Sequence, residues 1–179
     1  MTATLATARM TLRPFQPTDA PVLFTWVSDP EVMRFMPIPT GLDHTLEQTV
    51  ARVQRYMDHQ QKYGFSRWLI FDRASGLAIG DAGLLYMAAS DEIELGYRFA
   101  RPWWGQGRAT EVAAAWLDYA FGALHIPALV AFAEPENRAS LRVMEKLGMH
   151  FLRQEDIFGK VELIYGIQRP PQAEGKDTV

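Results

Sequence analysis

Two glycines, Gly105 and Gly107, separate an apolar stretch from an alanine-rich stretch with helical spacing. Glycine lets the backbone come close to a ligand, and the first amides of a helix have no intrahelical acceptor. Such amides, with the helix dipole behind them, can bind a phosphate group. The spacing therefore predicts an anion site whose natural occupant is a cofactor that carries a pyrophosphate.

A second group of candidates is a pair of carboxylates that precedes these glycines. Glu92 and Glu94 alternate with the apolar residues Ile93 and Leu95. In a regular strand, successive side chains point to opposite faces, so both carboxylates share the face opposite the apolar residues. A carboxylate placed there can accept a proton from a substrate, or it can fix a neighbouring strand by hydrogen bonds.

The elements that must position these residues follow from hydrophobic spacing and turn residues. The expected strands are residues 9–15, 67–71, 77–85, 92–99 and 128–133, with two more within 151–158 and 161–167. The expected helices are residues 18–27, 45–63, 112–121 and 137–147, and residues 29–42 show no clear period. In the helix over 45–63, Leu46, Val50, Val53 and Met57 form one apolar stripe. This order of elements favours a mixed α/β layer over a doubly wound parallel sheet.

Length and composition limit the class of protein. With 179 residues, 48% of them hydrophobic, the chain can bury one sizeable core. We expect one domain over residues 1–169 and a frayed polar tail over 170–179. A formal net charge of -3 gives no general reason to expect nucleic acid or a membrane surface as a partner. No long apolar run is free of charges, so we expect a cytoplasmic protein.

The residue types also restrict the chemistry. The chain has no cysteine, which excludes disulfides, thiolate metal sites and a cysteine nucleophile. The histidines are scattered and show no metal-ligand spacing, so we expect no metal. They are His44, His59, His125 and His150.

The run Trp104-Gly105-Gln106-Gly107-Arg108-Ala109 resembles motif A of the GNAT acetyltransferases. Gly107 and Ala109 match its fixed small positions. Trp104 stands where most members have arginine or glutamine. This tryptophan is typical of the branch that contains the ribosomal-protein N-terminal acetyltransferases (RimJ/RimL-like), so the resemblance favours that branch.

A second resemblance lies downstream, over residues 134–149. Asn137-x-x-Ser140 and Lys146-Leu147-Gly148 resemble motif B of the same family, with Met149 in place of the usual phenylalanine. Residues 28–34 also resemble the branch. The likeness therefore covers residues 9–167.

This resemblance implies the GNAT fold, a central and mostly antiparallel sheet of six to seven strands with one splayed pair and about four helices. It also implies acetyl-CoA as the acetyl donor. The backbone from Gly105 to Thr110 would hold the pyrophosphate, and the pantetheine arm would run beside the strand that ends at Phe99, where a free amide can stabilise an oxyanion. The implied cofactor-binding residues are Phe99, Trp104, Gly105, Gln106, Gly107, Arg108, Ala109, Thr110, Asn137 and Arg142.

The resemblance also implies catalytic roles. An amine with a pKa of about 10 is protonated at neutral pH, so acyl transfer to it needs a proton acceptor. Glu94, in Glu-Leu-Gly-Tyr, is the preferred general base over Glu92, and its alternative role is to fix a neighbouring strand. Ser140 replaces the motif B tyrosine, whose position Met144 occupies, as the donor to the CoA sulfur. A simple helix cap is the alternative role of Ser140.

For three other residues the alternatives also stay open. Asn137 can cap its helix or bind the pantetheine arm. Arg108 and Arg142 can each pair with a CoA phosphate or lie in solvent. Trp104 can shape the pantetheine groove or pack in the core.

The predicted activity is transfer of an acetyl group from acetyl-CoA to a primary amine, by direct attack in a ternary complex because no cysteine is present. The acceptor is a protein N-terminal amine or a small-molecule amine, and residues 33–43 and 158–160 would shape its site. One alternative is an acyl-CoA-binding sensor without turnover. A nucleotide enzyme is poorly supported, because no Gly-Lys-Ser/Thr ending follows the glycines. A monomer and a homodimer are both open.

Overall fold

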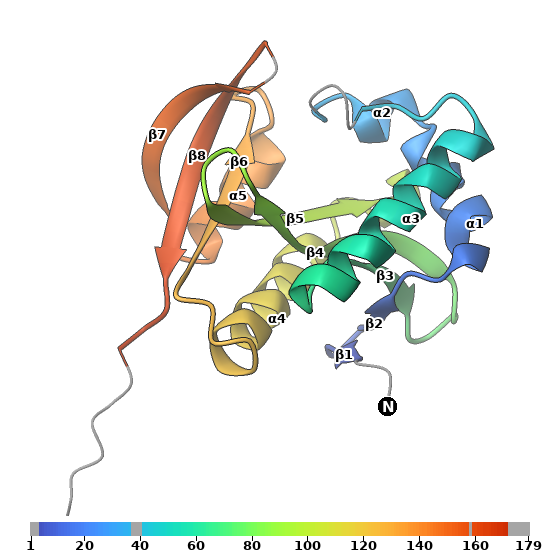
Figure 1. Cartoon of the computed structure of the whole chain (residues 1–179), viewed down its shortest axis with the longest axis horizontal. Helices are drawn as coiled ribbons and strands as arrows, with labels where there is room; N and C mark the ends of the chain where they lie inside the picture. The colour runs from blue at the N-terminus through green and yellow to red at the C-terminus, as the bar shows by residue number, and fades with distance from the viewer. Residues whose placement is uncertain (1–3, 37–40, 158, 172–179) are drawn as a thin grey trace, which may run out of the picture.

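The strands of the chain form one mixed sheet (Figure 1). The computed structural model describes residues 4–36, 41–157 and 159–171. The strands are β1 (Leu5–Ala6), β2 (Met10–Pro14), β3 (Arg67–Asp72), β4 (Ala78–Met87), β5 (Glu92–Phe99), β6 (Ala128–Ala133), β7 (His150–Ile157) and β8 (Lys160–Gln168). Across the sheet they follow the order β1-β2-β3-β4-β5-β6-β8-β7.

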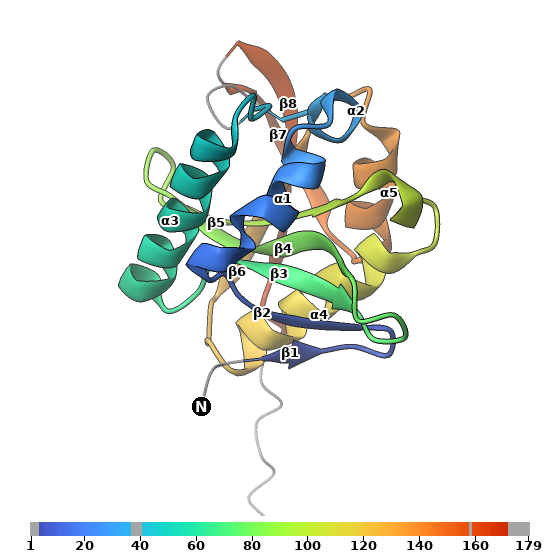
Figure 2. The ribbon, with the colours of Figure 1, turned by 90° about the vertical axis from the view of Figure 1, so that its right-hand side faces the viewer.

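Helices cover both faces of this sheet. They are α1 (Ala20–Val27), α2 (Pro30–Met33), α3 (Leu46–Tyr63), α4 (Arg108–Gly122) and α5 (Arg138–Lys146). Short 3₁₀ turns occupy Pro17–Asp19 and Arg101–Trp103. Figure 2 shows α1 and α3 on one face of the N-terminal strands, with α4 on the other.

Strand direction changes at one place in the sheet. Neighbouring strands are antiparallel except for β5 and β6, which are parallel and share the single residue pair Glu94 with Val130. Beyond this pair, the C-terminal half of β5 has β4 on one side and no strand on the other. The expected mixed, mostly antiparallel sheet with a splayed pair is confirmed.

Two elements were not expected from the sequence. Among the described residues there are eight strands rather than six to seven and five α-helices rather than about four. Strand β1 has two residues, and α2 has four, so neither is long enough to show a period. The start of α2 does carry a local signal, because Asp29 accepts a hydrogen bond from the amide of Glu31 and Pro30 follows at the first helical position.

Parts of three expectations lie outside the described residues. They are residues 172–179 of the tail, residues 37–40 of the expected acceptor segment, and residue 158.

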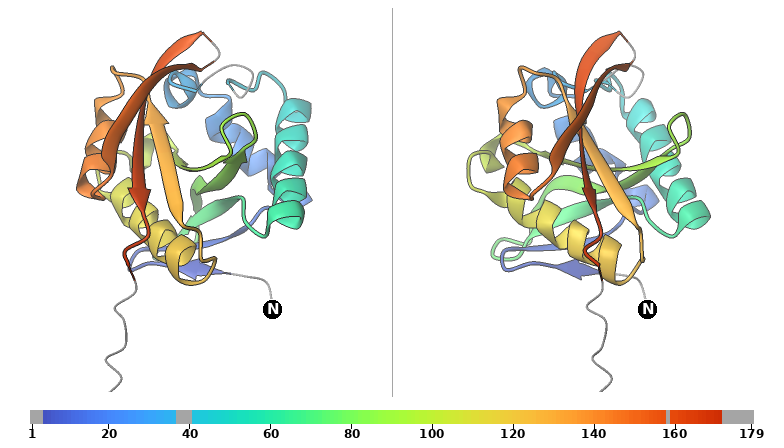
Figure 3. Two further views of the ribbon diagram at one scale, coloured as in Figure 1. Left: turned by 60° about the vertical axis from the view of Figure 1, so that its left-hand side comes forward. Right: turned by 90° about the vertical axis from the view of Figure 1, so that its left-hand side faces the viewer.

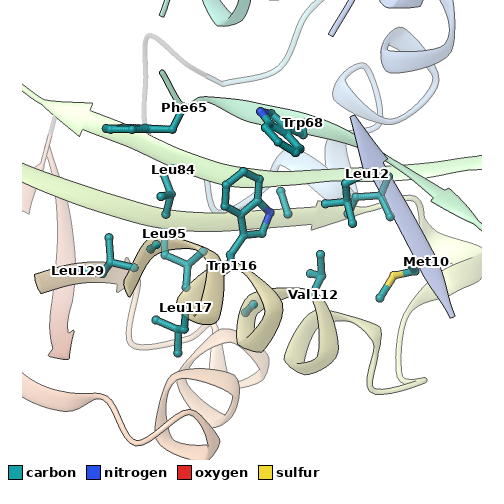
Figure 4. Packing of buried hydrophobic residues seen from close by; sticks show 14 of the residues in the cluster. Met10, Leu12, Phe65, Trp68, Leu84, Leu95, Val112, Trp116, Leu117 and Leu129 are labelled. Atoms are coloured by element: carbon teal, nitrogen blue, oxygen red, sulfur yellow. The ribbon is translucent and has the colours of Figure 1, made fainter. Parts of the chain in front are cut away.

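The main core lies between the sheet and α4. Alternation along β3 sends Trp68 and Ile70 toward α4, whereas Leu69 faces α1 and α3. Trp116 of α4 is fully buried, and its ring lies edge-on to that of Trp68 at a centroid distance of 5.0 Å (Figure 4). An edge-to-face pair contributes about 0.5–1.5 kcal/mol beyond the area that it buries. This packing holds the middle of α4 against the sheet.

The C-terminal strands have a separate small core. Ala131 and Ala133 of β6 pack against Leu141 and Met144 of α5, together with Met149. Figure 3 shows the long β7–β8 hairpin beside β6, with α5 along it. The splay between β5 and β6 opens where this small core meets the main core, and the two cores share the partly buried Leu147 and Ile167.

Candidate active site

The loop between β5 and α4 presents free backbone amides. Gly105 and Gly107 have φ values of +71° and +74°, a left-handed conformation that glycine adopts without strain. The first backbone hydrogen bond of α4 runs from the amide of Glu111 to the carbonyl of Gly107, at 3.1 Å. The amides of residues 108–110 precede this bond and have no acceptor within the helix. This loop has the geometry that a diphosphate needs.

The open edge of β5 adds further amides. The amide of Ala100 donates to the carbonyl of Ile79 in β4 at 2.9 Å. Because backbone groups alternate between the two edges of a strand, the amides of Tyr97 and Phe99 point to the opposite edge, into the splay. An extended arm such as pantetheine can hydrogen-bond there.

All twelve residues expected to bind the cofactor or to act in catalysis line one cavity of about 670 Å³. They are Glu94, Phe99, Trp104, Gly105, Gln106, Gly107, Arg108, Ala109, Thr110, Asn137, Ser140 and Arg142. Glu92 does not line this cavity and instead forms an ion pair with Arg153 of β7, at 2.7 Å. The two carboxylates, which the alternating pattern predicts on one face of the strand, therefore have different surroundings, and only Glu94 lines the cavity.

Glu94 is buried and held by a cation. Its Oε1 lies 3.1 Å from Nη2 of Arg67, and the residue is 7% exposed. The guanidinium of Arg67 lies over Gly96, where a Cβ atom would come within 2.0 Å of Nη2. The glycine of Glu-Leu-Gly-Tyr therefore makes room for the cation that holds Glu94.

The start of α5 lines the same cavity as Glu94. The side-chain oxygen of Asn137 accepts from the amide of Ser140 at 3.2 Å, so Asn137 caps the helix. Tyr97 reaches the same turn from β5, with its hydroxyl 3.4 Å from the carbonyl oxygen of Ser140. Burial raises the pKa of Tyr97 to about 12, so its hydroxyl stays protonated at neutral pH.

The structure corrects the expectation for the side chain of Arg108. Its Nη2 lies 2.8 Å from the carboxylate of Asp72, and its guanidinium stacks over the ring of Trp103 at 4.6 Å. The side chain is buried, so it does not lie in solvent, and its Nη1 has no hydrogen-bond partner among the described residues.

Exposure decides between the alternatives for Trp104 and leaves both alternatives for Arg142 open. Trp104 is 47% exposed and donates from Nε1 to the carbonyl of Phe99 at 2.6 Å, so it borders the cavity and is not a core residue. Arg142 is exposed at the cavity rim. A cation there can meet an anionic ligand.

Glu162 is a candidate that the sequence reading missed. It is 1% exposed on β8, and neither carboxylate oxygen has a hydrogen-bond partner among the described residues. Burial, followed by the charge of Glu134, raises its pKa to about 7, with Glu94 acting in the same direction and Lys160 opposing. A signal was present, because alternation over residues 161–167 places Glu162 on the same face as the buried Ile164.

Glu134 and Lys160 form an ion pair at this end of the cavity. The ammonium of Lys160 also donates to the carbonyl of Arg34 at 3.2 Å. Arg34 directly follows α2, so this contact joins the N-terminal half to the β7–β8 hairpin on the side of Glu94 that is remote from the phosphate loop.

Comparison with known proteins decides the family. The pattern described as an acetyltransferase (GNAT) domain matches residues 9–150. The chain belongs to the GNAT acetyltransferase family. Members of this family take the acetyl group from acetyl-CoA, and the protein is accordingly an acetyl-CoA-dependent acetyltransferase.

Individual relatives agree with this assignment. The chain is 34% identical to the uncharacterized protein YkkB of Bacillus subtilis over 164 residues, which is 90% of this chain and 93% of that protein. A GNAT acetyltransferase of Bacillus anthracis superposes with a TM-score of 0.80 at 25% identity, covering 93% of this chain and 99% of that one. RimL, a ribosomal L7/L12 α-N-protein acetyltransferase in complex with coenzyme A, has a TM-score of 0.79 at 18% identity, covering 93% and 98%; it shares the fold.

Two kinds of feature are absent from the described part of this GNAT chain: a membrane-spanning helix and a cluster of metal ligands. Every helix in the described ranges is too short or too polar to traverse a lipid bilayer. Within the same ranges, no three His, Asp or Glu side chains gather in a way that could hold a metal ion.

Proposed function

We propose that this GNAT enzyme is an N-acetyltransferase of the RimJ/RimL-like branch that acetylates a primary amine by direct attack in a ternary complex. One observation carries the proposal. A single cavity joins the free amides of the 105–110 loop to Glu94 and Ser140, so a donor anchored at one end can present its thioester at the other.

Acetyl-CoA fits the residues present. The left-handed glycines bring the loop amides together for the diphosphate, and the open edge of β5 offers the amides of Tyr97 and Phe99 to the pantetheine arm. Trp104 borders this route, and Asn137 lies across from it at the start of α5. Arg142 at the rim is available to a phosphate.

In the proposed reaction the amine nitrogen attacks the carbonyl carbon of the thioester. A C–N bond forms, the C–S bond breaks, and the sulfur leaves with the electron pair. Ser140, which lines the cavity at the start of α5, would donate a hydrogen bond to that sulfur, where the helix dipole favours negative charge. The amine proton passes to a carboxylate.

Two carboxylates are candidates for that proton. Glu94 lines the cavity, but one of its oxygens is already bonded to Arg67. Glu162 has two free oxygens and a pKa of about 7, close to the value that suits a general base at neutral pH. Since Glu162 does not line the cavity, it would receive the proton through a water or through Glu94.

The pH dependence of turnover separates these candidates. If Glu94 is the base, Glu94→Gln lowers kcat by about 10²–10⁴ while the Kd for acetyl-CoA stays near wild type. If Glu162 is the base, Glu162→Gln removes the rise of kcat through pH 7. Glu92→Gln is the matched control, because Glu92 lies on the same strand but pairs with Arg153 outside the cavity. Wild-type profiles in both test variants would remove both carboxylates from the mechanism.

The acceptor class is tested by thiol release from acetyl-CoA with a panel of amines. RimL acts on a ribosomal protein, and this supports a peptide with a free N-terminal amine as the first acceptor to try, next to small-molecule amines. We expect thiol release that depends on the acceptor. Tight acetyl-CoA binding with no acceptor-dependent release would favour the sensor.

A further inference from the structure

Arg9 holds the phosphate loop from the side opposite the cavity. Its Nη1 donates to the carbonyl oxygen of Gln106 at 2.9 Å. Gln106 and Gly107 both line the cavity, whereas Arg9 is not among the lining residues. The guanidinium therefore draws one carbonyl of the loop away from the space that the diphosphate would occupy.

The direction of this carbonyl determines the direction of the next amide. In a trans peptide the C=O and N–H groups point to opposite sides, so a carbonyl fixed toward Arg9 turns the amide of Gly107 toward the cavity. With the peptide plane reversed, a carbonyl oxygen would face the anion. Glycine populates both backbone orientations with little cost, so the loop sequence alone does not select one.

Arg9 is itself fixed by the first turn of α4. Its Nε donates to Oε2 of Glu111 at 2.6 Å, and its backbone amide donates to Oε1 at 2.9 Å. The hydroxyl of Thr7 donates to the same Oε1 at 2.6 Å. The β1–β2 hairpin, which Figure 2 shows running along the bottom of the molecule beside α4, is thus tied to the phosphate loop through one side chain.

We propose that Arg9 is a positioning residue for diphosphate binding, which locks the Gln106–Gly107 peptide with its N–H toward the cofactor. This inference rests on the proposed use of acetyl-CoA. It requires the fork of the guanidinium, because one side chain must bond Glu111 through Nε and Gln106 through Nη1 at the same time.

The test is calorimetric titration of three ligands: CoA, dephospho-CoA, which lacks the 3′-phosphate, and pantetheine, which lacks the diphosphate. We expect Arg9→Met to weaken CoA and dephospho-CoA alike, by roughly tenfold, and to leave pantetheine unchanged. Arg9→Lys keeps the charge but not the fork, so it should be impaired to the same degree. Arg73→Met is the control, because Arg73 donates to the carbonyls of Thr7 and Ala8 and not to the loop.

Four results would overturn the inference. Unchanged affinities in Arg9→Met would show that the lock does not matter. If Arg9→Met loses affinity for CoA but not for dephospho-CoA, Arg9 is a ligand of the 3′-phosphate. If Arg9→Lys binds CoA as tightly as the wild type, the charge of Arg9 matters and its guanidinium fork does not. An equal loss for all three ligands would mean a general disturbance of the fold. Failure of the wild type to bind CoA would instead count against the proposed function.

Discussion

At the scale of single residues, the least expected feature is a buried carboxylate with no hydrogen-bond partner among the described residues. Glu162 is buried on β8, and its pKa of about 7 lies well above the ordinary value of about 4.3. The folded state therefore binds the proton more tightly than the unfolded state. The contribution of Glu162 to stability is complete below pH 4.3 and is lost as the pH rises through 7.

Glu162→Gln tests this linkage, since glutamine resembles the protonated acid. At pH 8 the variant should exceed the wild type in free energy of unfolding by roughly 1–3 kcal/mol, and at pH 4.5 the two should be nearly equal. Urea denaturation at several pH values measures the difference. A difference that does not change between pH 4.5 and 8 would contradict the raised pKa.

Gly96 is the other residue whose role depends on a close contact. In Gly96→Ala the new methyl group would lie 2.0 Å from Nη2 of Arg67, so the guanidinium must leave its buried position beside Glu94. Loss of a buried ion pair and the packing around it should cost about 1–3 kcal/mol. Gly122→Ala is the control, because open space surrounds that position at the end of α4. Equal unfolding free energies for the two variants would refute the contact.

The sequence showed which side chains could act but not which partners they would find. The alternating pattern correctly predicted the strand that carries Glu92 and Glu94. It could not show that Glu92 would form an ion pair with Arg153 and that Glu94 would form one with Arg67. The burial of Arg108 depends on Asp72, which lies 36 positions earlier in the chain. Pairing between distant strands and loops decides such contacts, and a local pattern does not contain it.

At the scale of elements, the turn into α4 is the most constrained. Gly107 has a φ of +74°, and its Cβ position faces nothing closer than 3.8 Å, so a side chain there costs backbone strain rather than a protein clash. Gly76 has a φ of +71° with nothing within 4 Å, but it lies in the β3–β4 turn, away from the cavity. The two glycines therefore form a matched pair.

Gly107→Val and Gly76→Val should lower the melting temperature by similar amounts, since a β-branched residue is strained at positive φ in either turn. Only Gly107→Val should weaken CoA, by tenfold or more, because it alters the loop that binds the diphosphate. Calorimetry gives both affinities. Wild-type CoA affinity in Gly107→Val would show that the binding loop was placed wrongly.

Helix α3 is tied to β4 by His59. Its Nε2 accepts from the amide of Tyr86 at 3.0 Å, and Nδ1 lies 2.7 Å from the carbonyl of Phe65, an arrangement that requires the neutral ring. Burial lowers the pKa of His59 below its usual value of 6.5. Its contribution to stability is therefore complete above pH 6.5 and is lost as the pH falls, which is opposite in sign to the effect of Glu162.

The variant His59→Phe isolates this effect. It should be less stable than the wild type at pH 7.5, because two hydrogen bonds are lost, and the gap should narrow at pH 5.5, where the wild type pays for protonation. Thermal melting at the two pH values gives the gap. His44→Gln is the control: His44 is exposed, so this variant should melt at the same temperature as the wild type at both pH values. A gap of the same size at both pH values would contradict the lowered pKa.

The sequence predicted the positions of most helices and strands, but it predicted less well which face of each element is buried. In α3, Val53 is buried as the apolar stripe predicts, but Leu46 and Val50 are 39% and 51% exposed. That part of the stripe was wrong. The buried face instead carries Arg52, whose guanidinium bonds the carboxylate of Asp43 at 2.6 Å. This buried ion pair joins α3 to a residue that precedes the helix, and hydrophobic spacing cannot anticipate it.

At the scale of the whole molecule, two packed groups of elements meet at β5. The N-terminal strands share their cores with α1, α3 and α4, and β6 to β8 share a smaller one with α5, although Leu129 of β6 belongs to the main core. Only the family resemblance predicted this division, because strand order and the splay at Glu94 and Val130 leave no periodic mark in the sequence. The domain limits of 1–169, a cytoplasmic location and the oligomeric state stay predictions.

We propose that acetyl-CoA binds where these two groups of elements meet. The cavity proposed to bind it is lined by β5 and the start of α4 from one group, and by the start of α5 from the other. A ligand that contacts both groups in the folded state alone stabilises them together. At 100 times its Kd such a ligand contributes about 2.7 kcal/mol.

The most direct test of this account is a crystal structure of the protein with coenzyme A. We predict diphosphate oxygens within about 3 Å of the amides of residues 107–110, the pantetheine arm along the open edge of β5, and the sulfur between Glu94 and Ser140. Coenzyme A bound elsewhere, or a diphosphate held by side chains with the loop amides turned away, would contradict the account.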